Sequence, residues 1–316
     1  MSSLLRISDL TVEAIKALVY GSLYYEQNPQ DRRGLLARHK AALVFLKPSL
    51  RTRGAFQGAV EELGGNVHCY GPQEVGLGER ESPADVARTL KALGYSIIGA
   101  RVYQHEDLLQ MRAACDISVI NLLSNDDHPT QAIADALTLY QAWGRFWGRT
   151  VAWVGDGNNT ATSFVQIMLA LGVNVNIATP GGEYALAPEA VAAAQAFARQ
   201  SGAKFWEGKD PMQAVDQVDA IAVDVWASMH QKDELEKRRS VFAPYQLNRQ
   251  LLTFGGKGCN VLHCLPANRG WEITDDVIDD PASLVWKQAG NRLVAARGVL
   301  VRAAGLDLTR YIPPKD

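Results

Sequence analysis

The stretch AALVFLKPSLRTRGAFQGAVEELGG, residues 41–65, decides the fold of this chain because it reads as a strand, a junction and a helix in direct succession. Residues 41–46 (AALVFL) form a short apolar run of the length of a buried strand. Phe56, Val60 and Leu63 then recur at helical spacing until the glycine pair at 64–65, which favours the end of a helix. We therefore predict a strand followed directly by a helix.

Hydroxyl and guanidinium groups gather at this strand-to-helix junction, supplied by Ser49, Thr52, Arg51 and Arg53. A helix N-terminus favours an anion through its free N–H groups and its dipole, and arginine adds planar forks of fixed charge that suit phosphate oxygens. Another predicted strand, SIIGAR, ends at Arg101. A single arginine at a strand end is usually a solvated surface charge, but this combination favours a site for a compact phosphate.

Length and composition narrow the class of protein. A chain of 316 residues suggests two domains of about 150 residues each. Apolar residues make up 47% and charged residues 21%, without a run near the roughly 18 to 20 apolar residues of a membrane span. The N-terminal segment lacks the pattern of an export signal, so we expect a cytoplasmic protein. A net charge of −2 gives no global attraction to nucleic acid or membrane.

The four cysteines predict reduced thiols, because they form neither a C-x-x-C pair nor a disulfide framework. Cys259, His263 and Cys264 are the residues to consider for zinc. Cys259 lies in a glycine-rich turn, and adjacent residues of a strand point to opposite sides, so we predict no metal site.

Short apolar strands alternate with amphipathic helices along the whole chain, which predicts an α/β fold with mostly parallel sheets flanked by helices. A composition break at 144–149 predicts a first domain at 1–144 and a second at 145–316, whose last helix, about 291–304, is expected to pack back on the first domain. Ligands of open parallel sheets bind beyond the carboxyl ends of strands, so we expect the site in the cleft between the domains. The expected strands are 41–46, 66–70, 96–101, 117–121, 151–154, 173–178, 220–225 and 260–263, and the expected helices include 83–93, 160–171 and 187–201.

Two further polar motifs follow predicted strands and keep alternative interpretations. HPTQ at 128–131 starts a helix, and His128 is either a structural histidine or, beside Gln131, a donor to a carbonyl oxygen. GDGNN at 155–159 begins like a dinucleotide fingerprint, but Thr160 occupies the place of the third glycine. Its asparagines therefore indicate a weak nucleotide site, an amide site for a carboxylate or amine, or a turn.

Asp224 and Cys264 each end a predicted strand in the second half of the chain. Asp224 either holds a cationic amine or caps a turn. Cys264, in HCLPANRG at 263–270, is a nucleophile, a proton acceptor or a packing residue. Nucleophilic catalysis would require a base that the sequence does not identify.

Taken in order, these motifs resemble the aspartate/ornithine transcarbamylase superfamily, and most closely its ornithine carbamoyltransferase branch. The S-T-R-T-R motif of the family corresponds to residues 49–53, its lone arginine to Arg101, and its H-P-T-Q to residues 128–131. The branch motifs G-D-G-N-N, D-V-W-x-S-M-G, H-C-L-P-A-x-R-G and the closing N-R-L correspond to residues 155–159, 224–230, 263–270 and 291–293. The resemblance spans nearly the whole chain.

The resemblance implies transfer of a carbamoyl group from carbamoyl phosphate to the δ-amine of L-ornithine, giving L-citrulline and phosphate in arginine biosynthesis. It implies a homotrimer, or a multiple of it, that needs no cofactor or metal. The catalytic residues it implies are Arg101, His128, Asp224, Cys264 and Arg292. Those for carbamoyl phosphate are Ser49, Leu50, Arg51, Thr52, Arg101, His128, Gln131, Cys264, Leu265 and Arg292, and those for ornithine are Asn159, Asp224, Ser228 and Met229.

Some positions depart from the family pattern and keep other functions in view. Leu50 replaces a threonine and Gln57 a glutamate, while Gly76 stands where a neighbouring subunit usually supplies histidine or glutamine. His230 replaces the glycine of S-M-G. The alternatives are a transcarbamylase for N-acylated ornithine or another amine, a catalytically weakened regulatory homologue, and, last, a nicotinamide-dependent oxidoreductase.

Overall fold

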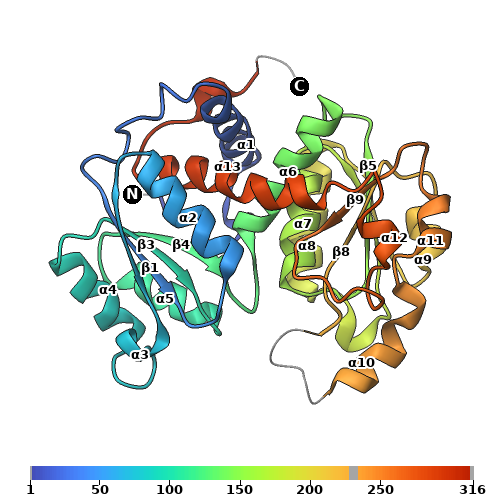
Figure 1. The fold of residues 1–316 in the computed structure, drawn as a ribbon, viewed down its shortest axis with the longest axis horizontal. Helices are drawn as coiled ribbons and strands as arrows, with labels where there is room; N and C mark the ends of the chain where they lie inside the picture. The colour runs from blue at the N-terminus through green and yellow to red at the C-terminus, as the bar shows by residue number, and fades with distance from the viewer. Residues whose placement is uncertain (1, 228–233, 314–316) are drawn as a thin grey trace. The chain divides into compact units, whose positions relative to one another are not determined.

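The computed structural model describes residues 2–227 and 234–313, and the chain divides into two compact units (Figure 1). Unit 1 comprises Met1–Leu137 and Gly290–Asp316, and unit 2 comprises Thr138–Ala289. Both boundaries fall inside helices, the first within α6 (Pro129–Trp143) and the second within α13 (Val285–Ala303). The domain limit at residue 144 stays a prediction.

Unit 1 is built on a parallel sheet with the strand order β2-β1-β3-β4. Its core packs apolar side chains of the strands against those of α4 and α5, among them Val44, Val86 and Leu108. The strands are β1 (Lys40–Phe45), β2 (Asn66–Tyr70), β3 (Ile97–Arg101) and β4 (Ser118–Leu123). The helices are α1 (Val12–Gln27), α2 (Leu50–Glu62), α3 (Pro72–Val75), α4 (Pro83–Ala92), α5 (His105–Ala114) and the first part of α6, with the 3₁₀ turns η1 (Ile7–Asp9) and η5 (Thr309–Tyr311).

The register of these strands decides which residues of unit 1 share an edge of the sheet. β1 and β3 are paired so that Phe45 lies opposite Arg101, and the junction after β1 therefore begins beside Arg101. A register shift at Ala100/Arg101 places Arg101 opposite Leu123, the last residue of β4. The carboxyl ends of the three neighbouring strands thus meet at one edge, where parallel sheets bind ligands.

Unit 2 is built on a parallel sheet with the strand order β7-β6-β5-β8-β9. The neighbours β5, β8 and β9 end at Val154, Val223 and His263, so the motifs that follow them share another carboxyl edge. The strands are β5 (Thr150–Val154), β6 (Asn174–Ala178), β7 (Phe205–Gly208), β8 (Ala220–Val223) and β9 (Asn260–His263). The helices are α7 (Asn159–Ala170), α8 (Pro188–Ser201), α9 (Pro211–Val215), α10 (Leu235–Phe242), α11 (Arg249–Phe254) and α12 (Asp275–Ile278), with the 3₁₀ turns η2 (Gly182–Tyr184) and η4 (Ala243–Tyr245).

The predicted fold class is confirmed, because each unit carries a parallel sheet flanked by helices (Figure 1). The predicted cap of α4 is also present, since the Ser82 side chain accepts a hydrogen bond from the Asp85 N–H. Strand β7 was not predicted from the sequence, because its residues FWEG are only partly buried and form no apolar run. It also placed the start of the last helix near 291, whereas α13 begins at Val285. Among the described residues, no helix combines the length and apolarity needed to cross a bilayer.

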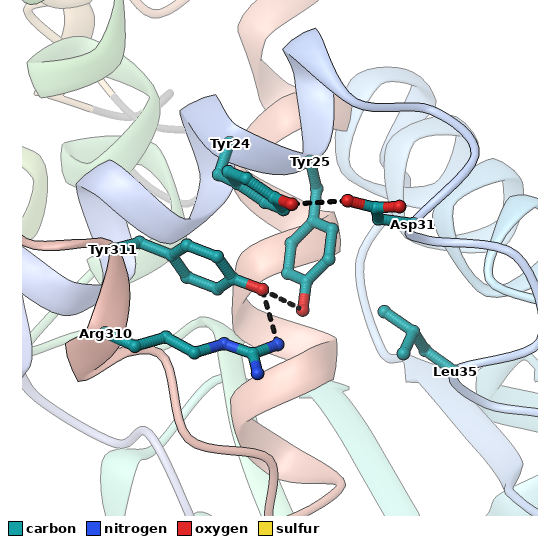
Figure 2. A pocket seen from close by; sticks show the side chains of 6 residues that line it. All are labelled: Tyr24, Tyr25, Asp31, Leu35, Arg310 and Tyr311. Carbon is teal, nitrogen blue, oxygen red and sulfur yellow. Dashed lines mark hydrogen bonds between the residues drawn. The ribbon is translucent and has the colours of Figure 1, made fainter.

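An open hollow of about 510 Å³ lies in unit 1 beside α1 and η5, and it is lined by Tyr24, Tyr25, Asp31, Leu35, Arg310 and Tyr311 (Figure 2). The ring of Tyr311 stacks on Tyr24 with a centroid distance of 4.1 Å and meets Tyr25 edge-on. The Tyr311 hydroxyl donates to the Tyr25 hydroxyl at 3.2 Å and accepts from Arg310 at 2.6 Å. We infer that the hollow belongs to a packing contact in which Tyr311 holds the C-terminal segment against α1.

Replacement of Tyr311 by alanine is expected to lower the free energy of unfolding by about 2 kcal/mol, because aromatic pairs contribute roughly 0.5–1.5 kcal/mol beyond the area that they bury. Tyr311→Phe keeps the ring and loses only the hydroxyl contacts, so its loss is expected near 1 kcal/mol. Urea unfolding of the two variants measures both values. Equal losses would show that the stacked ring does not hold this segment.

Candidate functional site

The junction between β1 and α2 places the polar residues of the quoted stretch at the carboxyl edge of unit 1. Ser49 is the N-cap residue of α2, but its hydroxyl accepts from Arg101 Nη1 at 3.5 Å instead of capping the helix. Leu50 is the first residue of the helix and is 84% exposed. The free first-turn N–H groups, the Ser49 hydroxyl and the Arg101 guanidinium therefore form one polar surface.

Arg292 of α13 reaches the same part of unit 1 from a distant part of the sequence. Its side chain is buried and donates from Nη2 to Thr52 Oγ1 at 2.9 Å and to Thr130 Oγ1 at 3.4 Å. Nη1 donates to Gln131 Oε1, and Gln131 in turn donates to Asp135 at 2.8 Å. These contacts orient the guanidinium within unit 1.

His128 shows that the guanidinium groups of unit 1 converge. The imidazole is 5% exposed, and its pKa lies well below 6.5, first because of burial and then because of the positive charges of Arg292, Arg101 and Arg51. The three arginines come from α13, the end of β3 and the first turn of α2, yet each acts on this one ring. His128 is therefore a neutral hydrogen-bonding group beside concentrated positive charge.

Lys47 is a basic residue at this edge that the sequence analysis did not select. Burial, followed by the positive charge of Arg101, lowers the pKa of its ammonium group to about 8. Its Nζ lies 4.3 Å from the ring centroid of Tyr103, where a cation is stabilised by the aromatic face. The sequence could have indicated Lys47, because this residue directly follows the predicted strand 41–46 and precedes the quoted arginines.

Asp224 lies at the centre of the polar cluster at the carboxyl edge of unit 2. It is 8% exposed and directly follows β8. One carboxylate oxygen accepts from Asn158 Nδ2 at 3.0 Å, and the other accepts from Cys264 Sγ and from the Val225 N–H, both at 2.8 Å. Asp224 and Cys264, which the sequence analysis selected separately, are therefore in direct contact.

The tandem asparagines make different contacts, and the ornithine role of Asn159 stays a prediction. Asn158 holds Asp224 and also caps α7, since its Oδ1 accepts from the N–H groups of Thr160 and Ala161. Asn159, the predicted ornithine contact, is the first residue of α7, and its Oδ1 accepts from the Thr160 N–H at 3.0 Å. The resemblance to the family indicated Asn159, whereas residue spacing alone does not show that Asn158 is the asparagine that contacts Asp224.

A buried brace, formed by the hydrogen bonds of His263 with Leu265 and Glu272, fixes the segment that carries Cys264 and Leu265. His263 Nδ1 accepts from the Leu265 N–H at 2.8 Å, so its other ring nitrogen, Nε2, donates to Glu272 at 3.1 Å. Both side chains are fully buried, and Glu272 also accepts from the Asn268 N–H. Glu272 was missed because nothing in the sequence signals that it is paired with His263.

Cys264 does not belong to a strand, contrary to the prediction. Cys264 lies after the end of β9, so it does not alternate with His263 as strand neighbours would. Ligand atoms of Asp224, His263 and Cys264 lie within 4.8 Å of one another. Both nitrogens of His263 are nevertheless engaged, by Leu265 and Glu272, and a metal ion would have to break this brace.

Of the remaining selected positions, Ser228, Met229 and His230 lie outside the described residues. Gly76 has a positive φ of 57°, and a Cβ there would lie 2.8 Å from Arg80 Cδ, so the local backbone itself favours glycine. Gln57 accepts from Cys69 Sγ at 3.7 Å, which gives it a packing role between α2 and β2.

Comparison with known proteins defines the family. Residues 2–141 match the carbamoyl-P binding domain, and residues 147–303 the Asp/Orn binding domain, of aspartate/ornithine carbamoyltransferases. This chain belongs to the aspartate/ornithine carbamoyltransferase family, and the resemblance found in the sequence is confirmed.

Relatives named ornithine carbamoyltransferase match most of the chain. The anabolic ornithine carbamoyltransferase of Pyrococcus furiosus is 40% identical over 304 residues, which cover 96% of each chain. The ornithine carbamoyltransferase of Methanospirillum hungatei is 40% identical over 268 residues, which cover 85% of this chain and 87% of the relative. The solved structure of the Pyrococcus furiosus enzyme aligns with a TM-score of 0.90 over 94% of this chain and 95% of that one.

Because the pKa of His128 is depressed, the free energy of unfolding is expected to fall at acidic pH, which a residue that does not titrate would not cause. Below pH 6.5, the ordinary pKa of histidine, the unfolded chain binds a proton on this imidazole, whereas the folded chain does not until much lower pH. The contribution is therefore complete above that pH and is lost as the pH falls, by up to about 1.4 kcal/mol per unit. Urea unfolding of the unmodified protein and of His128→Gln between about pH 5 and 7.5 measures it. Parallel pH dependences would contradict the neutral, buried state.

Proposed function

We propose that this protein is an ornithine carbamoyltransferase, which transfers the carbamoyl group of carbamoyl phosphate to the δ-amine of L-ornithine. The cationic amine first gives up one proton, its nitrogen then forms a bond to the carbonyl carbon, and the bond from that carbon to the phosphate oxygen breaks. The nitrogen gives up a second proton, which the departing phosphate or water takes up. The products are L-citrulline and phosphate. The observation that carries this proposal is that Arg101 and Arg292, from distant parts of the chain, donate to Ser49 and Thr52 at the start of α2.

Carbamoyl phosphate is the substrate that suits unit 1. Its phosphate carries two negative charges, which Arg51, Arg101 and the first-turn N–H groups of α2 would hold together with the Thr52 hydroxyl. Neutral His128 then acts as a donor to the carbonyl oxygen rather than as an acid. Charge on that oxygen and on the departing phosphate grows during the reaction, and fixed guanidinium groups stabilise it without reorganisation. The hydrogen bonds of Arg292 to Thr52 and Gln131 support a similar role for its guanidinium.

An amino acid with a terminal amine is the substrate that suits unit 2. The Asp224 carboxylate accepts hydrogen bonds from Asn158 and Cys264, and a cationic amine is the natural partner for this charge. We assign the δ-amine to the neighbourhood of Asp224 and Cys264, where the carboxylate is the acceptor for the proton that leaves. Asn159, Ser228 and Met229 complete the ornithine contacts in this proposal.

The assembly and setting follow the family. We propose a homotrimer, or a multiple of it, that works in the cytoplasm in arginine biosynthesis. The anabolic relative supports this metabolic role. The four cysteines are free thiols, which suits a reducing compartment.

An amine panel tests the proposed function directly. With carbamoyl phosphate present, L-ornithine is expected to yield citrulline at roughly 1 to 10³ per second, the ordinary range for enzymes. N-acetyl-L-ornithine and putrescine are expected to react far more slowly. Turnover confined to another amine would assign a different substrate, which the replacement of glycine by His230 makes worth testing. No turnover with any amine would indicate the regulatory homologue.

Arg101→Ala is expected to reduce kcat/KM for carbamoyl phosphate by about 10² to 10³, the usual effect of removing one group that stabilises developing negative charge. KM for ornithine is expected to change little. Arg88→Ala is the matched control, because Arg88 belongs to the same unit but pairs with Asp85 on the surface, with the arginine side chain 60% exposed. Steady-state kinetics with each substrate varied in turn measure both constants. Unaltered kinetics in the Arg101→Ala variant would show that Arg101 does not belong to the phosphate site.

A further inference from the structure

Arg238 is a buried arginine of unit 2 to which none of the proposed steps assigns a role. It lies on α10, and its side chain is 5% exposed. The guanidinium lies over the rings of Tyr184 and Phe242, at 5.0 and 5.3 Å from their centroids. Nε donates to the backbone carbonyl of Trp226, two residues after Asp224, and Nη2 forms an ion pair with Asp156. A charge buried this deeply needs such fixed partners.

Asp156 belongs to the turn that follows β5 and precedes α7. Its side chain is 13% exposed, and its backbone carbonyl accepts from Trp153 Nε1 at 2.9 Å, so the turn is held from both sides. The pKa of Asp156 is raised to about 7, chiefly by burial and also by the negative charge of Asp224, while the positive charge of Arg238 opposes this rise. Asp156 and Asp224 therefore interact electrostatically.

The ion pair reaches Asp224 along two short routes. On one route the chain passes from Asp156 to Asn158, whose side chain donates to Asp224 at 3.0 Å. On the other, Arg238 holds the Trp226 carbonyl on the chain that leaves Asp224. Both the hydrogen-bond donor to Asp224 and the backbone beyond it are thus fixed by one guanidinium.

We propose that Arg238 and Asp156 form a positioning pair for the amine-binding half of the site, in which Arg238 orients the Asp156 turn and the Trp226 carbonyl and thereby holds Asn158 against Asp224. Neither residue touches the reacting atoms in this account. The identity of the amine in this inference rests on the proposed function, whereas the contacts among Arg238, Asp156 and Asn158 do not depend on it.

The pair also gives this half of the site a pH dependence of defined sign. Above a pH of about 7, Asp156 is ionised and neutralises Arg238. As the pH falls, Asp156 takes up a proton, the ion pair is lost, and the positive charge of Arg238 then opposes a cationic amine at Asp224. The charged and titratable groups that face Asp156 or Arg238 are Asp224 after β8, Glu183 and Tyr184 of η2, Lys237 paired to Glu183, and Glu234 at 3.8 Å from Arg238.

Asp156→Asn is the isosteric test, because it fixes the neutral form at every pH. We expect KM for ornithine to rise about 10- to 100-fold at pH 8, the range found when the supports of metal-ligating side chains are removed. KM for carbamoyl phosphate is expected to stay within about twofold. The ratio of variant to unmodified ornithine KM should fall towards one as the pH drops below about 7, since both proteins then carry a neutral residue there. A ratio independent of pH would overturn the proposal.

Arg238→Lys and Arg238→Met separate charge from packing. The lysine variant keeps the charge and is expected to recover part of the ornithine affinity, whereas the methionine variant fills space only and is expected to lose it. Asp219→Asn is the matched control, because Asp219 forms an ion pair with Arg149 at 2.6 Å in the same unit. Asp219 directly precedes β8, and its side chain is 26% exposed. Equal effects of all four substitutions on ornithine KM would show a general loss of stability and would reject a positioning role.

Alkylation of Cys264 gives a readout that does not depend on activity. Its thiol donates to Asp224, and displacement of that carboxylate should free the sulfur to react faster. Iodoacetamide labelling mapped by mass spectrometry is expected to accelerate in Asp156→Asn and in Arg238→Met but not in Asp219→Asn. If every amine fails to react but labelling accelerates, the proposed function fails and the positioning pair stands. If ornithine turns over normally and labelling is unchanged in the Asp156 and Arg238 variants, the positioning pair fails and the proposed function stands.

Discussion

Repulsion between like charges around one buried imidazole is the constraint on which the account of unit 1 depends. Arg51, Arg101 and Arg292 each depress the pKa of His128, and Arg101 also lowers the pKa of Lys47. A dianion bound near these arginines would be stabilised by their charges. Such an arrangement is expected of an anion site, and it is the opposite of what burial alone would favour.

Parallel sheets explain how short segments far apart in the chain meet within each unit. The pairing of Phe45 with Arg101 aligns the ends of β1 and β3, so one polar edge forms without a long loop. In unit 2 the neighbours β5, β8 and β9 bring Asn158, Asp224 and Cys264 together in the same way. Each unit therefore offers a rigid edge on which side chains are held by their neighbours, as a site that must orient a substrate requires.

The sequence predicted those parts of the molecule whose signals are local. The run at 41–46, the Ser82 cap and the arginines around residue 51 were readable because each depends on its own neighbours in the chain. The links from Arg292 to Thr52 and from Asp156 to Arg238 were not, because residue spacing carries no information on which distant side chain completes a pair. The role of Glu272 could not be predicted for the same reason. Strand β7 could not be predicted because it lacks an apolar run. The resemblance to a family supplied Arg292, which the residues alone did not indicate.

A crystal structure with a phosphonate analogue of carbamoyl phosphate tests the central claim most directly. The account predicts one phosphorus group bound by the guanidinium groups of both Arg51 and Arg101, by first-turn N–H groups of α2 and by the Thr52 hydroxyl, with the carbonyl oxygen facing His128. An analogue bound elsewhere, or Arg51 and Arg101 too far apart to share one anion, would contradict it.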